Sequence, residues 1–168
     1  YALWRFPMLT ETFIRREIEA LRASGTDVEA VALGKDDPRM LDDRASPAGD
    51  VKYYGPADTD LGRAQIRRML ARKPLTVFKL WLFIVRRHDN RLRTWWRDRD
   101  LLYASAQLAA LIEALRDTPV HSPWGNHHSL VAFFAARLAG VTFSAEVRAS
   151  EINRFGEARN RFAIRRHC

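Results

Sequence analysis

Apolar and polar residues recur along the chain with two different periods, which predict short strands between amphipathic helices. Ile14 and Ile18 share one face of a helix that Thr10 can cap and Gly25 can end. A second clear helix is expected at 129–138. Short, mostly apolar or alternating runs predict strands at residues 1–6, 28–33, 51–54, 120–122 and 141–147. This alternation favours an α/β fold: a Rossmann-like parallel sheet flanked by helices.

A basic helical insertion is expected at about residues 58–100. Its first helix carries Ile66, Met69 and Leu70 on one side and ends before Pro74. Its second helix places apolar residues at helical spacing, namely Val77, Leu80, Trp81, Ile84 and Val85, with Phe78, Leu82 and Phe83 widening the face. We expect an arginine- and tryptophan-rich linker at residues 91–100, followed by a long helix at 101–115.

Length and composition narrow the class of protein. The 168 residues, 47% of them hydrophobic, suit one domain with a real core, so disorder and a disulfide-stapled mini-protein are excluded. No apolar run approaches the roughly 20 residues of a membrane-spanning helix, and no signal-peptide pattern is present. The start without Met and the charged end without a helix cap lead us to expect a fragment, with residues 1–168 forming one domain.

The positive charge is concentrated in the middle of the chain. The whole chain has 28 Lys+Arg against 20 Asp+Glu, and residues 61–100 alone hold 12 basic and 3 acidic side chains. Basic residues mixed with Trp suit an anionic membrane surface; equally, the apolar face packs into the core and the arginines are simply solvated. Nucleic acid is disfavoured, because no nucleic-acid-binding motif accompanies the charge. The candidate membrane-surface residues are Arg67, Arg68, Arg72, Lys73, Lys79, Trp81, Arg86, Arg87, Trp95 and Trp96.

Three segments that follow predicted strands are rich in side chains able to bind ligands, and in parallel sheets ligands bind beyond the carboxyl ends of the strands. Residues 6–14 read FPMLTETFI, and they resemble the FP-x-x-S/T-E-T-F-I opening of the bacterial family 4 glycosyltransferases. Residues 121–144 resemble that family's H-x-x-W/F block with its A-A-R-L-x-G continuation. Residues 148–152, RASEI, fall where many members read H-A-x-D-I.

The resemblance implies one half of a GT-B fold: the N-terminal, acceptor-binding domain of a retaining hexosyltransferase that builds exopolysaccharide or lipopolysaccharide. It implies a glycan or lipid-linked acceptor at the cytoplasmic membrane face, with peripheral attachment to the inner face of the plasma membrane. The UDP- or GDP-sugar would be bound mainly by the missing C-terminal domain. We therefore expect no cofactor or metal in this fragment and no activity from it alone.

The resemblance also assigns candidate residues. Arg148 and Glu151, the catalytic candidates, stand where many relatives have His and Asp. An arginine can grip a phosphate but cannot shuttle a proton at neutral pH; either Arg148 clamps an anionic ligand or the site is altered. The acceptor- or phosphate-binding candidates are Thr10, Glu11, Thr12, His121, Trp124, Gly125 and Asn126.

Each of these candidates also has a structural explanation. Glu11 in the first turn suits the helix dipole whether or not it orients a hydroxyl. His121 and Trp124 are equally compatible with a packed core position. His127 and His128 either cap a helix or reach the crevice, and their spacing matches no metal motif. The alternative function is a non-catalytic α/β module that binds a membrane surface or an anion.

Overall fold

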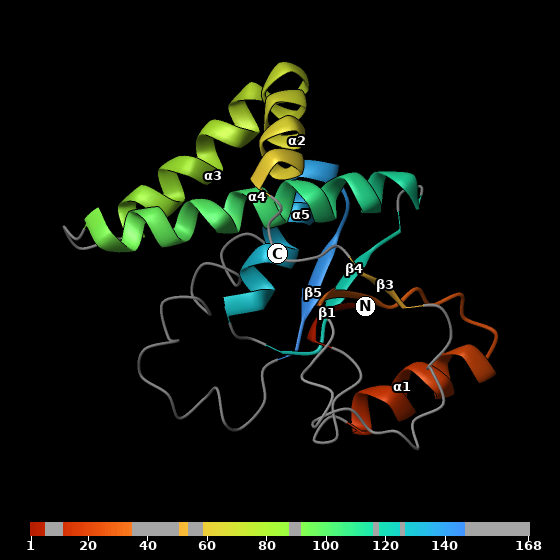
Figure 1. Ribbon diagram of the computed structural model, residues 1–168. Helices are drawn as coiled ribbons and strands as arrows, with labels where there is room; N and C mark the ends of the chain where they lie inside the picture. Colours follow the sequence, from red (N-terminus) through yellow and green to blue (C-terminus); the bar gives the residue numbers. More distant parts are fainter. Residues whose placement is uncertain are drawn as a thin grey trace. The chain divides into compact units, whose positions relative to one another are not determined.

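The computed structural model describes residues 1–5, 12–34, 51–53, 59–87, 92–115, 118–124 and 127–146. The chain divides into two units, Tyr1–Pro56 and Ala57–Cys168, and each is described by itself. Both units combine parallel strands with helices, as Figure 1 shows. The predicted mixed α/β class is confirmed, with helices predominating.

The first unit contains a three-stranded parallel sheet in the order β1-β2-β3. Its strands are β1 (Ala2–Arg5), β2 (Val31–Gly34) and β3 (Lys52–Tyr53). The register places Leu3 of β1 opposite Ala32 of β2, which also pairs with Tyr53 of β3. Leu3 and Ala32 are both buried, and β2 is the central strand of this sheet. Its short apolar sequence suits a strand flanked on both sides.

Helix α1 (Thr12–Ala23) follows β1 and buries Ile14 and Ile18 completely, as their four-residue spacing predicts. It ends where Gly25 adopts a positive φ of 86°, and the Thr26 amide donates to the Leu21 carbonyl over 3.0 Å. This arrangement is a Schellman C-cap. The predicted N-cap, Thr10, lies outside the described residues.

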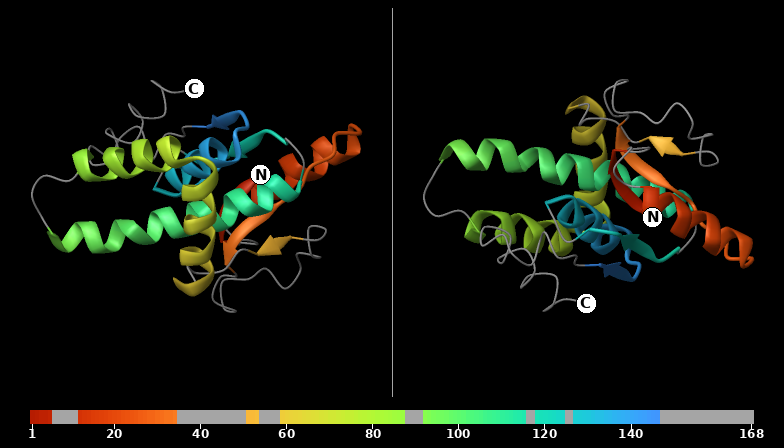
Figure 2. Two further views of the ribbon diagram at one scale, coloured as in Figure 1. Left: turned by 90° about the horizontal axis from the view of Figure 1, so that it is seen from above. Right: turned by 90° about the horizontal axis from the view of Figure 1, so that it is seen from below.

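The second unit is dominated by four helices: α2 (Thr59–Arg72), α3 (Pro74–Arg87), α4 (Leu92–Ala114) and α5 (His127–Ala139). Both α5 and α2 pack mainly on α4, and Figure 2 shows α2 crossing α4 steeply. Leu108 of α4, with Leu130 and Phe134 of α5, is almost completely buried. The core of this unit therefore lies along the α4–α5 contact.

A glycine allows the close crossing of α2 and α4. A Cβ placed on Gly62 would lie 2.7 Å from the Cβ of Tyr103, and Gly62 is buried. Real Cβ atoms do not approach so closely, so a larger residue here would force the two helices apart. This position explains why a glycine occurs inside α2 despite its low helix propensity.

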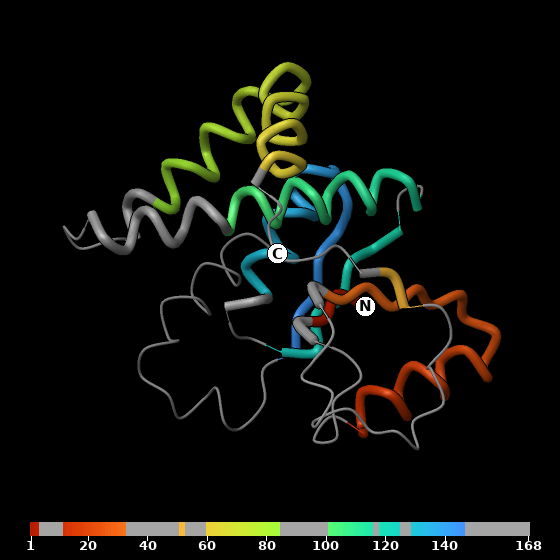
Figure 3. The backbone as a smooth tube through the Cα atoms, viewed as in Figure 1, coloured from red at the N-terminus to blue at the C-terminus, as the bar shows by residue number. Residues whose placement is uncertain are grey.

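Strands β4 (Val120–Ser122) and β5 (Phe143–Ala145) are parallel and joined through α5, a path that can be followed in Figure 3. His121 lies opposite Ser144. Helix α5 ends at Gly140, whose φ is 88°. Within the predicted 141–147, strand β5 covers Phe143–Ala145, and residue 147 lies outside the described residues.

The structure differs from the sequence-based predictions in the arrangement of the sheet, the linker at 91–100 and the burial of Leu70. The described strands do pair in parallel, but in a three-stranded sheet in the first unit and a two-stranded sheet in the second. The predicted linker at 91–100 is wrong, because α4 begins at Leu92 and neither Gly nor Pro interrupts residues 92–114. The insertion at 58–100 thus continues into α4. Leu70, placed on the inner side of its helix by periodicity, is 47% exposed.

Candidate functional site

The turn after β4 is held in place by two buried hydroxyls. Ser122, the last residue of β4, donates from Oγ to the Trp124 carbonyl over 3.1 Å. Ser129, in the first turns of α5, donates to the same carbonyl, and the two hydroxyls lie 3.2 Å apart. The side chains of both serines are buried. The strand end, the turn and the helix start therefore form one hydrogen-bonded corner.

Polar side chains lie together along β4 and β5: His121 and Ser144 are the middle residues of these strands, and Glu146 follows β5. The Nδ1 atom of His121 lies 2.9 Å from the Ser144 hydroxyl, and these residues are register partners. A carboxylate oxygen of Glu146 and a ring nitrogen of His121 lie within 4.8 Å of each other. The Glu146 amide donates to the Ser122 carbonyl over 3.0 Å, which extends the pairing beyond β5. We call His121, Ser144 and Glu146 the β4–β5 edge cluster.

The edge cluster offers the hydrogen-bonding groups that a polyhydroxylated ligand requires. Ser144 can donate and accept, Glu146 accepts when ionised, and His121 does either according to its tautomer. Glu146 follows β5, so the cluster reaches the carboxyl end of that strand, beyond which parallel-sheet proteins bind ligands. Ser144 and Glu146 were not among the sequence candidates, although the alternation over residues 141–147 does place them on one face of the strand.

The structure brings together only part of the predicted acceptor site. Among the described candidates, His121 lies on β4 and Trp124, half-buried, lies just after it. Thr12 is exposed at the first residue of α1, in the other unit. The candidates that lie outside the described residues are Thr10, Glu11, Gly125, Asn126, Arg148 and Glu151. The side chains of His127 and His128 also lie outside the description.

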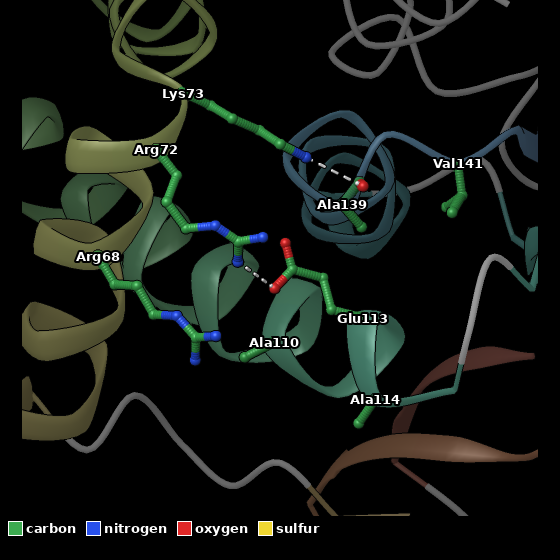
Figure 4. Close-up of a pocket in the computed structure, with 8 residues that line it drawn as sticks. All are labelled: Arg68, Arg72, Lys73, Ala110, Glu113, Ala114, Ala139 and Val141. Atoms are coloured by element: carbon green, nitrogen blue, oxygen red, sulfur yellow. Dashed lines mark hydrogen bonds and ion pairs between the residues drawn. The ribbon is translucent and has the colours of Figure 1, made fainter.

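Two of the candidate membrane cations make contacts within the fold. Figure 4 shows Arg72 reaching from α2 towards Glu113 of α4, with 2.9 Å between Nη1 and Oε2. In the same view Lys73 Nζ donates to the Ala139 carbonyl over 3.1 Å, and it also donates to that of Leu138 over 2.7 Å. These carbonyls end α5, where a cation is favourable. Lys73 thus joins the α2–α3 corner to α5.

Other candidate cations are exposed. Arg67, Arg68 and Lys79 are solvent-exposed, and Arg68 lines one side of an open cavity of about 530 Å³ together with Arg72 and Lys73 (Figure 4). Glu113 lines the same cavity, so a bound anion would meet a carboxylate as well as the cations. Arg86 and Arg87 end α3 and Trp95 and Trp96 lie in α4, but their side chains are outside the description.

Helix α3 carries apolar residues both on its buried side and on the neighbouring exposed side. Val77, Leu80 and Ile84 are buried, as their spacing predicts, whereas Leu75, Phe78 and Trp81 are 63%, 55% and 41% exposed. The Phe78 and Trp81 rings stack with their centroids 6.0 Å apart. We call these three exposed residues the α3 apolar face. These three residues are spaced three apart, so they follow one another along one side of the helix.

No protein-family model, no curated protein and no solved structure matches this chain. Among the helices of the described residues, none is both long enough and apolar enough to cross a bilayer.

Proposed function

We propose that this chain is the acceptor-binding domain of a retaining glycosyltransferase of the family 4 type, forming one half of a GT-B fold. The observation that carries the proposal is the edge cluster. The sequence block that resembles this family at 121–144 coincides with the segment β4–α5–β5, whose two strands carry His121 and Ser144 and are followed by Glu146. The first resembling block continues into α1, whose Ile14 and Ile18 are fully buried.

In the proposed reaction the edge cluster holds a hydroxyl-bearing acceptor. His121 and Ser144, 2.9 Å apart, bind and orient acceptor hydroxyls, and the buried Ser122–Ser129 pair keeps the neighbouring turn in place. In the retaining scheme the leaving phosphate of the nucleotide-sugar takes the proton of the acceptor hydroxyl. This domain therefore contributes position and hydrogen bonds rather than a strong base. The donor, a UDP- or GDP-sugar, is bound mainly by a second domain.

The test measures sugar transfer from UDP- and GDP-sugars by the enzyme with its donor-binding domain in place. His121→Ala and Ser144→Ala are each expected to lower kcat/KM by about tenfold, the effect of one lost hydrogen bond to a bound ligand. Arg148→Ala tests the predicted phosphate clamp in the same assay. Ser24→Ala, which removes an exposed hydroxyl after α1, is the matched control. Absence of transfer from every donor, or equal rates in His121→Ala and the control, would contradict the proposal.

The second candidate is a non-catalytic module that binds an anionic membrane surface, and it is favoured by the α3 apolar face. Trp81 and Phe78 are exposed on the same helix as the exposed Lys79. Indole rings favour the membrane interface, and each nearby cation adds about 1 kcal/mol of attraction to anionic lipid. This surface is compatible with the glycosyltransferase proposal, since a lipid-linked acceptor is presented at a membrane.

Vesicle co-sedimentation tests the membrane surface directly. Binding to phosphatidylglycerol vesicles is expected to exceed binding to phosphatidylcholine vesicles and to weaken as salt rises. Trp81→Ser and Phe78→Ser are expected to weaken it further, while Thr142→Ala, another exposed position in this unit, leaves it unchanged. Binding that is the same for both lipids, at low and high salt, and in both variants would overturn the membrane proposal.

A further inference from the structure

A second cavity lies between α3 and α5, away from the edge cluster. Its volume is about 590 Å³, a size typical of small-molecule sites, and the described residues that line it all belong to these two helices. We call it the α3–α5 cavity. None of the described residues that line it is acidic. In this respect it differs from the cavity beside Arg68, which contains Glu113.

The inner part of the α3–α5 cavity is aromatic and rigid. Phe133 and Phe134 of α5 are buried, and the Phe83 ring of α3 meets Phe134 edge to face with 5.6 Å between centroids. Phe133 is fixed in turn by Phe143 of β5, at 5.6 Å and also edge to face. Leu82 completes the apolar lining on the α3 side. This surface suits a hydrocarbon chain and offers it no polar group to desolvate.

The outer edge of the α3–α5 cavity is cationic. Lys79 of α3 and Arg137 of α5 are both exposed and line the cavity from opposite helices. The Arg137 guanidinium lies 5.5 Å from the centre of the Phe133 ring, within the range of a cation–π interaction that keeps the cation beside the aromatic lining. Thr76 adds a hydroxyl. Two cations and a hydroxyl around one opening suit a doubly charged anion better than a carboxylate.

We propose that the α3–α5 cavity binds a single-chain alkyl phosphate, with the chain against Phe83 and Phe133 and the phosphate between Lys79 and Arg137. The apolar lining and the cationic edge each account for one half of such a molecule. Leu75, Lys79 and Leu82 share one side of α3 at four- and three-residue spacing, and Leu75 is exposed. The opening therefore adjoins the α3 apolar face, along which a chain longer than the cavity continues.

Calorimetric titration with decyl phosphate below its micelle concentration tests this proposal. The expected result is one bound molecule per chain, with much weaker binding of decanol and of inorganic phosphate, each of which has only half of the required chemistry. Affinity is expected to rise by up to about fourfold per added methylene from octyl to dodecyl phosphate while the chain still gains burial. Equal affinity for decyl phosphate and decanol would overturn the phosphate contact.

Charge-removing variants locate the site. Lys79→Met and Arg137→Met are each expected to weaken decyl phosphate binding by about tenfold, because each removes a charge-assisted hydrogen bond. Arg67→Met, which removes an exposed cation of α2 that does not line the cavity, is the matched control. Equal weakening by all three variants would show general charge attraction and refute the site. The site shares no residue with the edge cluster, so its failure and the failure of sugar transfer in His121→Ala are separate results.

Discussion

Helices α5 and α3 have similar lengths and are both rich in apolar residues, yet the protein uses them differently. In α5 every residue from Leu130 to Ala136 is buried, and Phe134 has no exposed surface. In α3 only one side is buried, through Val77, Leu80 and Ile84, while the α3 apolar face stays in solvent. The difference arises because α5 packs extensively on α4 and also contacts β4 and β5, whereas the contacts of α3 with the other described helices are smaller.

This comparison separates apolar residues that stabilise the fold from apolar residues that are available to a partner. An apolar side chain contributes to folding only when the tertiary structure removes it from water. Leu75, Phe78 and Trp81 gain less in this way than the fully buried side chains of α5, and they follow one another along one partly exposed side of α3. We therefore assign α5 to the core and α3 to both core and surface.

The largest expected effect on stability comes from replacing one phenylalanine in each of the two helices by alanine. Phe134→Ala is expected to lower the free energy of unfolding by about 3–5 kcal/mol, because it leaves a cavity in the centre of the core. Phe78→Ala is expected to change it by about 0.5 kcal/mol or less. Chemical denaturation of the two variants measures both values. Similar losses in the two variants would refute the distinction between α5 and α3.

A smaller loss of stability is expected from a substitution at the crossing of α2 and α4. Gly62→Ala is expected to destabilise the fold by about 1–3 kcal/mol through overpacking against Tyr103, although alanine is the better helix former. The exposed Ala64→Gly change in the same helix is the control and should cost about 1 kcal/mol from propensity alone. If Gly62→Ala were stabilising instead, the close approach of α2 and α4 would be wrong.

Lys73 and Lys79 are both candidate membrane-surface residues by sequence, but their substitution is expected to affect different properties. Lys73 contributes to stability and Lys79 to ligand binding. Lys73→Met removes the cation at the end of α5 and should cost about 1–2 kcal/mol of stability. Lys79→Met should leave stability nearly unchanged while it weakens binding of decyl phosphate, because Lys79 is exposed at the α3–α5 cavity. Thermal unfolding and calorimetry of the two proteins measure the contrast. A stability loss in Lys79→Met as large as in Lys73→Met would contradict it.

The smallest effect is expected from the ion pair between α2 and α4. A double-mutant cycle with Arg72→Ala and Glu113→Ala should give a coupling of about 0.2–1 kcal/mol, because the Arg72 side chain is 49% exposed and solvent screens the pair. The coupling should decrease in high salt. A coupling that salt leaves unchanged would mean that the pair is more deeply buried than its exposure indicates.

The sequence located the secondary-structure elements more completely than it located the residues of the proposed site. It named His121 and Trp124, which the structure places on β4 and just after it, because parallel-sheet proteins bind ligands near the ends of their strands. Ser144 and Glu146 were missed because their relevance depends on the pairing of β5 with β4, which aligns Ser144 with His121. The two-residue spacing of Ser144 and Glu146 is evident in the sequence, but no local pattern indicates which strand pairs with β5.

Local periodicity and turn chemistry determined most of the elements of this protein. The four-residue spacing of Ile14 and Ile18 located α1, and Gly25 and Gly140 marked the ends of two helices because both adopt a positive φ. Only the tertiary structure decided which apolar side of α3 is buried and which cations form hydrogen bonds or ion pairs within the fold. Lys73 meets the carbonyl of Leu138, 65 residues further along the chain, so no local pattern could reveal that contact. A side chain is buried, or a cation is paired, only when two surfaces from different parts of the chain meet. The sequence of one segment describes only one of those two surfaces.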